Sequence, residues 1–260
     1  MKKTKISWSS FDLWRLCPHA YDLFYLEEKG FDLDEKQDRF FAIIGSVIQE
    51  IFSRFYNDQL WRLKKEAIPY LTDTLLPKVW PFVLDGFTVN WENHDKSEKE
   101  LYEEAKGMIP KVTKLLLGEK LLFPNGLQRA EVKHMLPFNE ENGIYLMGKV
   151  DFLFKDSEVI ILDGKATHNV KDDQLYFYSY LYELINGELP DKIGYIYYDT
   201  AEVSYIKFSA RKYNRLKKEI NELVQAIDKK DFPAKPELNK CEACTLKSIC
   251  SKKELNNATA

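Results

Sequence analysis

The sequence has no apolar run long enough to cross a bilayer, and it has little of the glycine and proline that mark linkers and low-complexity chains. Glycine occurs 11 times and proline 10 times in 260 residues, whereas 45% of the residues are hydrophobic. No internal repeat is present. These shortages argue against a membrane-spanning protein and against a disordered or repetitive chain. They predict a single domain over residues 1–260 that buries a core of its own.

The start of the chain is basic, but it lacks the apolar segment of a secretory signal. Lysines occur at positions 2, 3 and 5, and Asp12 and Arg15 follow almost at once. We therefore expect a cytoplasmic protein. The net charge of −3 gives no general electrostatic case for nucleic-acid binding, and the basic excess in residues 211–253 is equally typical of a solvated helix face.

Cysteine is scarce, and its four copies are unevenly placed. One lies near the N-terminus and three lie near the C-terminus: Cys17, Cys241, Cys244 and Cys250. In a cytosolic protein a Cys-x2-Cys pair predicts metal binding before a disulfide, because the compartment keeps thiols reduced. Four thiolates suit either zinc or an iron–sulfur cluster.

Hydrophobic periodicity predicts an α/β fold. Residues 9–26, capped by Ser9 or Ser10, and residues 40–55 have the spacing of helices. The period then changes to short β-branched and aromatic runs at about residue 129. The expected strands are 129–138, 144–154, 158–165, 193–198 and 203–208, with helices at 172–186 and 211–229. The predicted organisation is an N-terminal helical region (1–30), a helical insertion (60–125), a catalytic core (129–210) and a cysteine-rich tail (237–253).

Two carboxylates and a lysine are predicted to meet at one end of the sheet. Asp163 and Lys165 project to the same face of a strand, and Asp151 lies on the hairpin partner strand. Neighbouring carboxylates repel each other unless a hard divalent cation lies between them. Such a cation polarises a phosphodiester oxygen and lowers the pKa of a bound water, while the lysine orients that water. Taken alone, an Asp-x-Lys at a strand end is more often a surface pair.

These residues resemble the signature of the PD-(D/E)XK nuclease superfamily, which has an acidic residue on one strand and Asp or Glu, any residue, then Lys on the next. Gln174 and Tyr178 reproduce the Gln-x-x-x-Tyr motif of its RecB-like branch. Spaced i, i+4, they share a helix face and could contact DNA or support the active-site strand. The plainer interpretation makes Tyr178 a core residue.

The cysteine spacing is similar to that of the iron–sulfur nucleases of the RecB, AddB and CRISPR-associated adaptation type. Ser9 or Ser10, Cys17-Pro18 and Tyr21 resemble the N-terminal motif of that group, and Phe232-Pro233 resembles its linker before the cluster. The resemblance implies a restriction-endonuclease-like core with a mixed central sheet flanked by helices. It also implies a 4Fe-4S clasp that joins the N- and C-terminal segments.

The same resemblance implies a DNA exonuclease that acts on single strands or free ends with Mg²⁺ or Mn²⁺. Asp151, Asp163 and the main-chain carbonyl of Gly164 would bind the cation, and Lys165 would position the water. DNA is the expected partner, and protein partners are not identifiable.

The chain departs from this group at one metal ligand. Gly45-x-x-x-Gln49 stands where the group has Gly-x-x-x-His, so a neutral amide oxygen would replace an imidazole. Glu131 lies where relatives often have an acidic residue, and it could equally be a solvent-facing carboxylate. The rival hypothesis is therefore a catalytically weak or inactive DNA-end-binding or protein-interaction module. The four histidines are taken as surface or core residues: His19, His94, His134 and His168.

Overall fold

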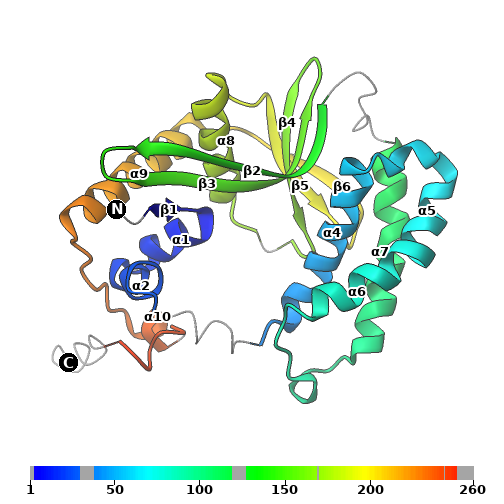
Figure 1. The fold of residues 1–260 in the computed structure, drawn as a ribbon, viewed down its shortest axis with the longest axis horizontal. Coiled ribbons are helices and arrows are strands. Elements are labelled where there is room, and N and C mark those ends of the chain that lie inside the picture. The colour runs from blue at the N-terminus through cyan, green and yellow to red at the C-terminus, as the bar shows by residue number, and fades with distance from the viewer. Residues whose placement is uncertain (1–2, 30–37, 119–126, 169, 243, 251–260) are drawn as a thin grey trace. The chain divides into compact units, whose positions relative to one another are not determined.

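The computed structural model describes residues 3–29, 38–118, 127–168, 170–242 and 244–250 (Figure 1). The chain forms two compact units, each built from separate stretches of sequence. The first contains residues 1–37, 135–148 and 211–260, and the second contains residues 38–134 and 149–210. Within the described residues, no helix is both long enough and apolar enough to span a membrane.

The first unit joins the two ends of the chain. Its helices are α1 (Trp8–Leu16), α2 (Pro18–Tyr21), the π-helix η1 (Asp22–Leu26), α9 (Ala210–Lys229) and α10 (Leu238–Glu242). Strand β1 (Thr4–Ile6) pairs in parallel with residues 144–146 at the start of β3 (Ile144–Lys155). Arg15 of α1 forms an ion pair with Glu219 of α9, and the ring of Tyr21 packs on Phe232. The N-terminal segment therefore contacts the C-terminal one.

The N-terminal helix differs from the sequence expectation in its cap and its length. Ser7, rather than Ser9 or Ser10, is the N-cap, and it forms a capping box with Ser10. The helix ends at Leu16 because Cys17 is extended (φ −159°, ψ 111°), as a residue before proline tends to be. Pro18 then starts a new helix at its favoured N1 position.

The second unit consists of a sheet and helices. Its strands are the first part of β2 (Leu127–Asn139), the second part of β3, β4 (Val159–Lys165), β5 (Lys192–Tyr197) and β6 (Glu202–Ile206). β3 and β4 are antiparallel, β4 and β5 are parallel, and β5 and β6 are antiparallel. The sheet is therefore mixed, as predicted. Strand boundaries agree with the expected runs to within about two residues.

Most helices of the second unit lie in the stretch before the sheet; residues 119–125 of the expected insertion (60–125) lie outside the described residues. The helices are η2 (Phe40–Ala42), α4 (Ile43–Asn57), η3 (Leu60–Glu66), α5 (Ala67–Pro69), η4 (Tyr70–Leu75), α6 (Leu76–Leu84), η5 (Trp91–Asn93) and α7 (Glu98–Gly118), with α8 (Asp173–Asn186) later in the chain. α4 contacts α6, α7 and β4 (Figure 1).

The core of this unit lies between α4 and one face of the sheet. The buried α4 side chains recur at helical spacing: Ile43, Val47, Ile48, Ile51, Phe52 and Phe55. They share a hydrophobic cluster with residues that alternate along the strands: Phe152, Phe154, Ile160, Leu162 and Ile196. Asp163 and Lys165 alternate with these core residues along β4, and Lys165 contacts Gln174 of α8, the helix that packs against β4 and β5.

Candidate active site

The predicted carboxylates and lysine come together where β3 and β4 pair. The register sets Phe152 opposite Leu162, and one further step sets Asp151 opposite Asp163. Asp151 Oδ2 accepts a hydrogen bond from the Gly164 amide at 3.0 Å. Lys165 Nζ lies 2.5 Å from Asp163 Oδ2, and Asp163 is only 1% exposed. The three side chains therefore form one contiguous polar group at a buried position.

Burial raises the pKa of both carboxyl groups, and the charge of Asp163 adds to the rise at Asp151. Desolvation, followed by the charge of Asp163, raises the pKa of Asp151 to about 8. Desolvation also raises the pKa of Asp163, although Lys165 opposes this shift. Two buried carboxyls that resist joint ionisation are stabilised in their charged form by a cation. The site is therefore suited to a divalent metal ion.

Gln174 and Tyr178 connect to this group through the lysine. Lys165 Nζ donates to Gln174 Oε1 at 3.0 Å, and Gln174 Nε2 donates to the Tyr178 hydroxyl at 2.9 Å. Tyr178 is 6% exposed, and burial raises its pKa, with the charges of Asp163 and Asp151 adding to the effect. The i, i+4 pair on α8 thus holds the lysine from one side while Asp163 holds it from the other.

The remaining candidate site residues line an open pocket beside Asp151. Its lining includes Gln49 of α4, Glu131 of β2, Asp151 and Gly164. Glu131 has a left-handed backbone (φ +54°), which is strained for a residue with a side chain, and its carboxylate lies 2.5 Å from Lys149 Nζ. Glu131 is therefore ion-paired and also borders the pocket.

Tyr198 and the absence of a side chain at Gly164 are two features that the sequence did not suggest. The Tyr198 hydroxyl donates to Gln49 Oε1 at 2.5 Å, and Tyr198 is 1% exposed. A Cβ at Gly164 would collide with the Tyr198 hydroxyl and ring. Position 164 therefore has to be glycine for Tyr198 to reach Gln49. Tyr198 follows directly on β5 and has no motif around it, so only the three-dimensional arrangement reveals it.

The oxygen donors at this site fit a hard cation. Asp151, Asp163 and Gln49 offer side-chain oxygens, and Mg²⁺ commonly binds through one or two carboxylates while it keeps several waters. Across the described ranges, no three His, Cys, Asp or Glu side chains lie in an arrangement that would hold a metal by themselves. A cation here would therefore depend on main-chain, amide and water oxygens beside the carboxylates.

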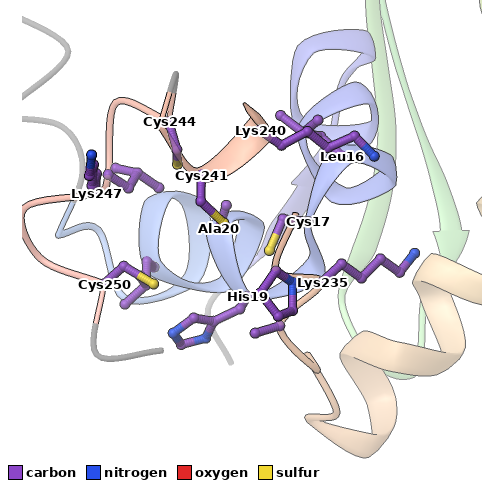
Figure 2. A pocket seen from close by; sticks show the side chains of 14 residues that line it. Leu16, Cys17, His19, Ala20, Lys235, Lys240, Cys241, Cys244, Lys247 and Cys250 are labelled. Carbon is purple, nitrogen blue, oxygen red and sulfur yellow. The ribbon is translucent and has the colours of Figure 1, made fainter. Parts of the chain in front are cut away.

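The four cysteines gather around a separate pocket in the first unit (Figure 2). Its lining also contains Leu23 and Leu246, which are buried together with Ala20. Burial raises the pKa of the Cys244 thiol, and the three other cysteines add to the rise. The thiols are thus close enough to repel as thiolates, although they do not form a closed ligand set. Lys235, Lys240 and Lys247 also line this pocket.

Two of the histidines, His168 and His94, contact neighbouring rings and acids outside the Asp151–Asp163 pair. His168 stacks on Tyr197, with ring centroids 3.9 Å apart, and its Nε2 lies 3.5 Å from Asp199 Oδ1. His94 stacks on Phe40, and burial lowers the pKa of His134. His19 lines the cysteine pocket.

A mixed sheet that places two carboxyl groups next to a lysine is the arrangement expected of a class of protein, the α/β nucleases that cleave phosphodiesters with a divalent metal. The sequence comparison agrees, because the profile of the PD-(D/E)XK nuclease superfamily matches residues 5–251. The chain belongs to this superfamily. The assignment supports a metal-dependent nuclease with a DNA substrate, and members usually use Mg²⁺ or Mn²⁺.

Other comparisons add little to this assignment. No curated protein matches the chain. A solved structure titled "Crystal structure of SSO0001" is similar over 60% of this chain and 79% of its own, with 19% sequence identity and a TM-score of 0.33.

Proposed function

We propose that this protein is a DNA exonuclease that hydrolyses phosphodiesters at single strands or free ends with Mg²⁺ or Mn²⁺. The observation that carries the proposal is the position of Lys165, whose ammonium bridges the buried Asp163 and Gln174 beside a second, half-buried carboxyl group, that of Asp151. An isolated surface pair would be exposed and screened, whereas Asp163 is 1% exposed. The preference for single strands or ends rests on the resemblance to RecB-like nucleases.

Each residue has a proposed role. Asp151, Asp163 and the Gly164 carbonyl would hold the cation, with Gln49 as a further oxygen donor and Glu131 at the rim of the pocket. A bound cation would supply Lewis-acid activation of the phosphodiester and of a water. Lys165 orients that water and offsets negative charge as it develops. Gln174 and Tyr178 keep the lysine in place through their hydrogen bonds.

We further propose that Cys17, Cys241, Cys244 and Cys250 hold a 4Fe-4S cluster. The support for this proposal is that all four cysteines line one largely apolar pocket, and four thiolates are the ligands that such a cluster takes. One cysteine lies near the N-terminus and three near the C-terminus, as in the iron–sulfur nucleases, and this resemblance is the reason for proposing iron instead of zinc. The cluster would fasten the N-terminal segment to the C-terminal tail.

A nuclease assay tests the main proposal. Purified protein is incubated with an end-labelled single strand, with the matching duplex and with a closed circular single strand, in Mg²⁺ and in Mn²⁺. The linear strands should be degraded, the circle should survive, and EDTA should stop the reaction. Cleavage of the circle would show that the protein is an endonuclease. Inactivity in both metals would refute the enzymatic proposal.

The second candidate function is a DNA-end-binding or protein-interaction module with weak or no cleavage. The specific observation in its favour is that Gln49, at the position where the group has a histidine ligand, already shares its amide oxygen with Tyr198. This module would bind labelled DNA ends without shortening them. The same assay therefore separates the two functions.

Anaerobic purification tests the cluster. A 4Fe-4S protein should be brown, with broad absorbance at about 400 nm, and should contain iron and sulfide. Colourless protein with one zinc per chain would show that the thiolates hold zinc instead.

A further inference from the structure

Phe41 is the most exposed of the large apolar side chains that the structure describes, at 86%. It lies in η2, directly before α4. A single exposed apolar residue is ordinary on a protein surface, so its exposure alone carries no argument. Its surroundings and its place on the helix distinguish it.

The ring of Phe41 is held by a small group of aromatic contacts. It lies edge-on to Phe40 (centroids 5.2 Å apart, 89°) and to His94 (5.8 Å, 85°). His94 in turn stacks on Phe40 at 3.8 Å. Asp38 fixes this group, because its carboxylate lies 2.8 Å from His94 Nε2 and accepts the Phe40 amide at 3.0 Å. The buried Phe40 therefore supports the ring of Phe41, while most of the Phe41 surface is exposed.

Phe41 lies about one turn before the residues of α4 that border the catalytic pocket. It precedes Gly45 by four residues, a spacing that makes the two positions neighbours on a helix surface. Gly45 and Gln49 line the pocket that contains Asp151. At about 1.5 Å per residue, eight residues separate Phe41 from Gln49 by about 12 Å.

We propose that Phe41 is a stacking platform for a nucleotide base of single-stranded DNA that enters the catalytic pocket. This inference rests on the proposed nuclease function and specifies its substrate. Every base has a π-face, so stacking on an aromatic ring binds single strands without sequence preference. A base in a duplex is already covered by its neighbours.

The test measures binding and cleavage of a labelled single strand by wild-type protein, Phe41→Ala, Phe41→Leu and Phe41→Trp. Binding is measured by fluorescence anisotropy in EDTA, where no cleavage occurs. Phe41→Ala and Phe41→Leu should each lose about five- to a hundred-fold in affinity, because neither has a ring, and Phe41→Trp should restore it. Tyr205→Ala on the edge strand β6 removes another exposed ring (47%) and should leave affinity unchanged.

A scan of abasic sites distinguishes base stacking on Phe41 from other contacts between the protein and the strand. Removing the base at one position of the strand should weaken binding to wild-type protein by the same factor as Phe41→Ala, and it should have no effect on Phe41→Ala itself. In cleavage, Phe41→Ala should raise KM and leave kcat at saturating DNA unchanged. Its melting temperature should match wild type, since the side chain is exposed.

Equal affinities for wild type and Phe41→Ala, or an abasic effect that persists in Phe41→Ala, would overturn the stacking proposal and leave the ring as a protein-contact residue. Failure of the nuclease proposal has a different signature. In that case wild-type protein would not cleave in Mg²⁺ or Mn²⁺, whereas the anisotropy and abasic measurements would still report on Phe41.

Discussion

The Tyr198 hydroxyl donates a hydrogen bond of 2.5 Å to Oε1 of Gln49, which joins the end of β5 to the middle of α4. Tyr198 also continues the strand pairing, because its amide donates to the Lys165 carbonyl at 2.8 Å. Its ring stacks on Phe52 of α4, with centroids 6.3 Å apart. One buried side chain therefore connects the helix that carries Gln49 with the strand that carries Asp163 and Lys165.

Removing this hydroxyl should affect stability and metal binding together. Tyr198→Phe leaves the buried Gln49 oxygen without its donor, so we expect a loss of about 1–2 kcal/mol in the free energy of unfolding. Gln49→Ala should make Tyr198→Phe nearly neutral, because the partner is already gone. Urea unfolding of both single variants and the double variant measures this coupling. If the losses in unfolding free energy of the two single variants add up to that of the double variant, the hydrogen bond contributes nothing to stability.

Gly164→Ala should be far more harmful than an ordinary glycine-to-alanine change in a strand. The added Cβ meets the Tyr198 hydroxyl, so either Tyr198 or β4 has to move. We expect a destabilisation of about 1–3 kcal/mol, together with reduced nuclease activity because Asp163 and Lys165 flank the shifted residue. Gly107→Ala in α7 is a matched control, since no atom lies within 4 Å of its added Cβ. Wild-type activity in Gly164→Ala would show that the site tolerates this movement.

Lys165→Ala and Asp163→Ala should each abolish cleavage, by at least about 100-fold, while DNA binding remains. Asp163→Ala should also lose affinity for Mn²⁺ in a calorimetric titration, whereas Lys165→Ala should not. Lys192→Ala is a suitable control, because that lysine also forms an ion pair with a carboxylate, Glu158, in the same unit but away from the site. Retained activity in either site variant would place the chemistry elsewhere.

The metal-free protein should lose stability as the pH rises. The pKa of Asp151 is raised from 3.8 in the unfolded chain to about 8 in the folded protein, so its neutral form is favoured by folding. The stability that the neutral Asp151 contributes to the folded state is fully present below about pH 4 and is lost as the pH rises through about 8. Mg²⁺ should reverse the trend by binding the ionised carboxyls. Thermal melts with and without the metal test this, with Asp151→Asn as the control that removes the dependence.

Cys17→Ser should cost more stability than a change at an ordinary half-buried residue. Under the cluster proposal it removes the only N-terminal ligand, so the protein should lose iron and unfold at a lower temperature. Cys241→Ser should give the same iron loss. If both variants keep the iron content and melting temperature of wild type, the cysteines do not act as a ligand set.

The strands and most of the longer helices were predictable from periodicity, because their apolar residues alternate or recur every three to four positions. The N-terminal segment was harder. Residues 9–26 have the composition of one helix, yet Pro18 forces Cys17 out of the helical region and divides it. The short strand β1 has three residues, too few for a periodic signal.

At the site, the sequence identified the residues that share a local pattern. Asp163, Lys165, Gln174 and Tyr178 follow one another within one strand–helix unit, and hydrogen bonds run from Lys165 through Gln174 to Tyr178. Tyr198 and Gly164 act through a contact between residues 34 positions apart, and spacing gives no hint of it. Phe41 is exposed, and exposure cannot be read from a hydrophobic pattern that runs on into a buried helix.

The cysteine pocket also has a consequence for biosynthesis. One thiol is made within the first 17 residues, and the other three are the last to emerge, at positions 241, 244 and 250. A chain under synthesis therefore carries a single thiol until residue 241 is made, whereas the carboxylates and lysine of the second unit are complete by residue 165. The residues of the proposed catalytic site are thus all synthesised before a second cysteine is available to pair with Cys17 in a cysteine site.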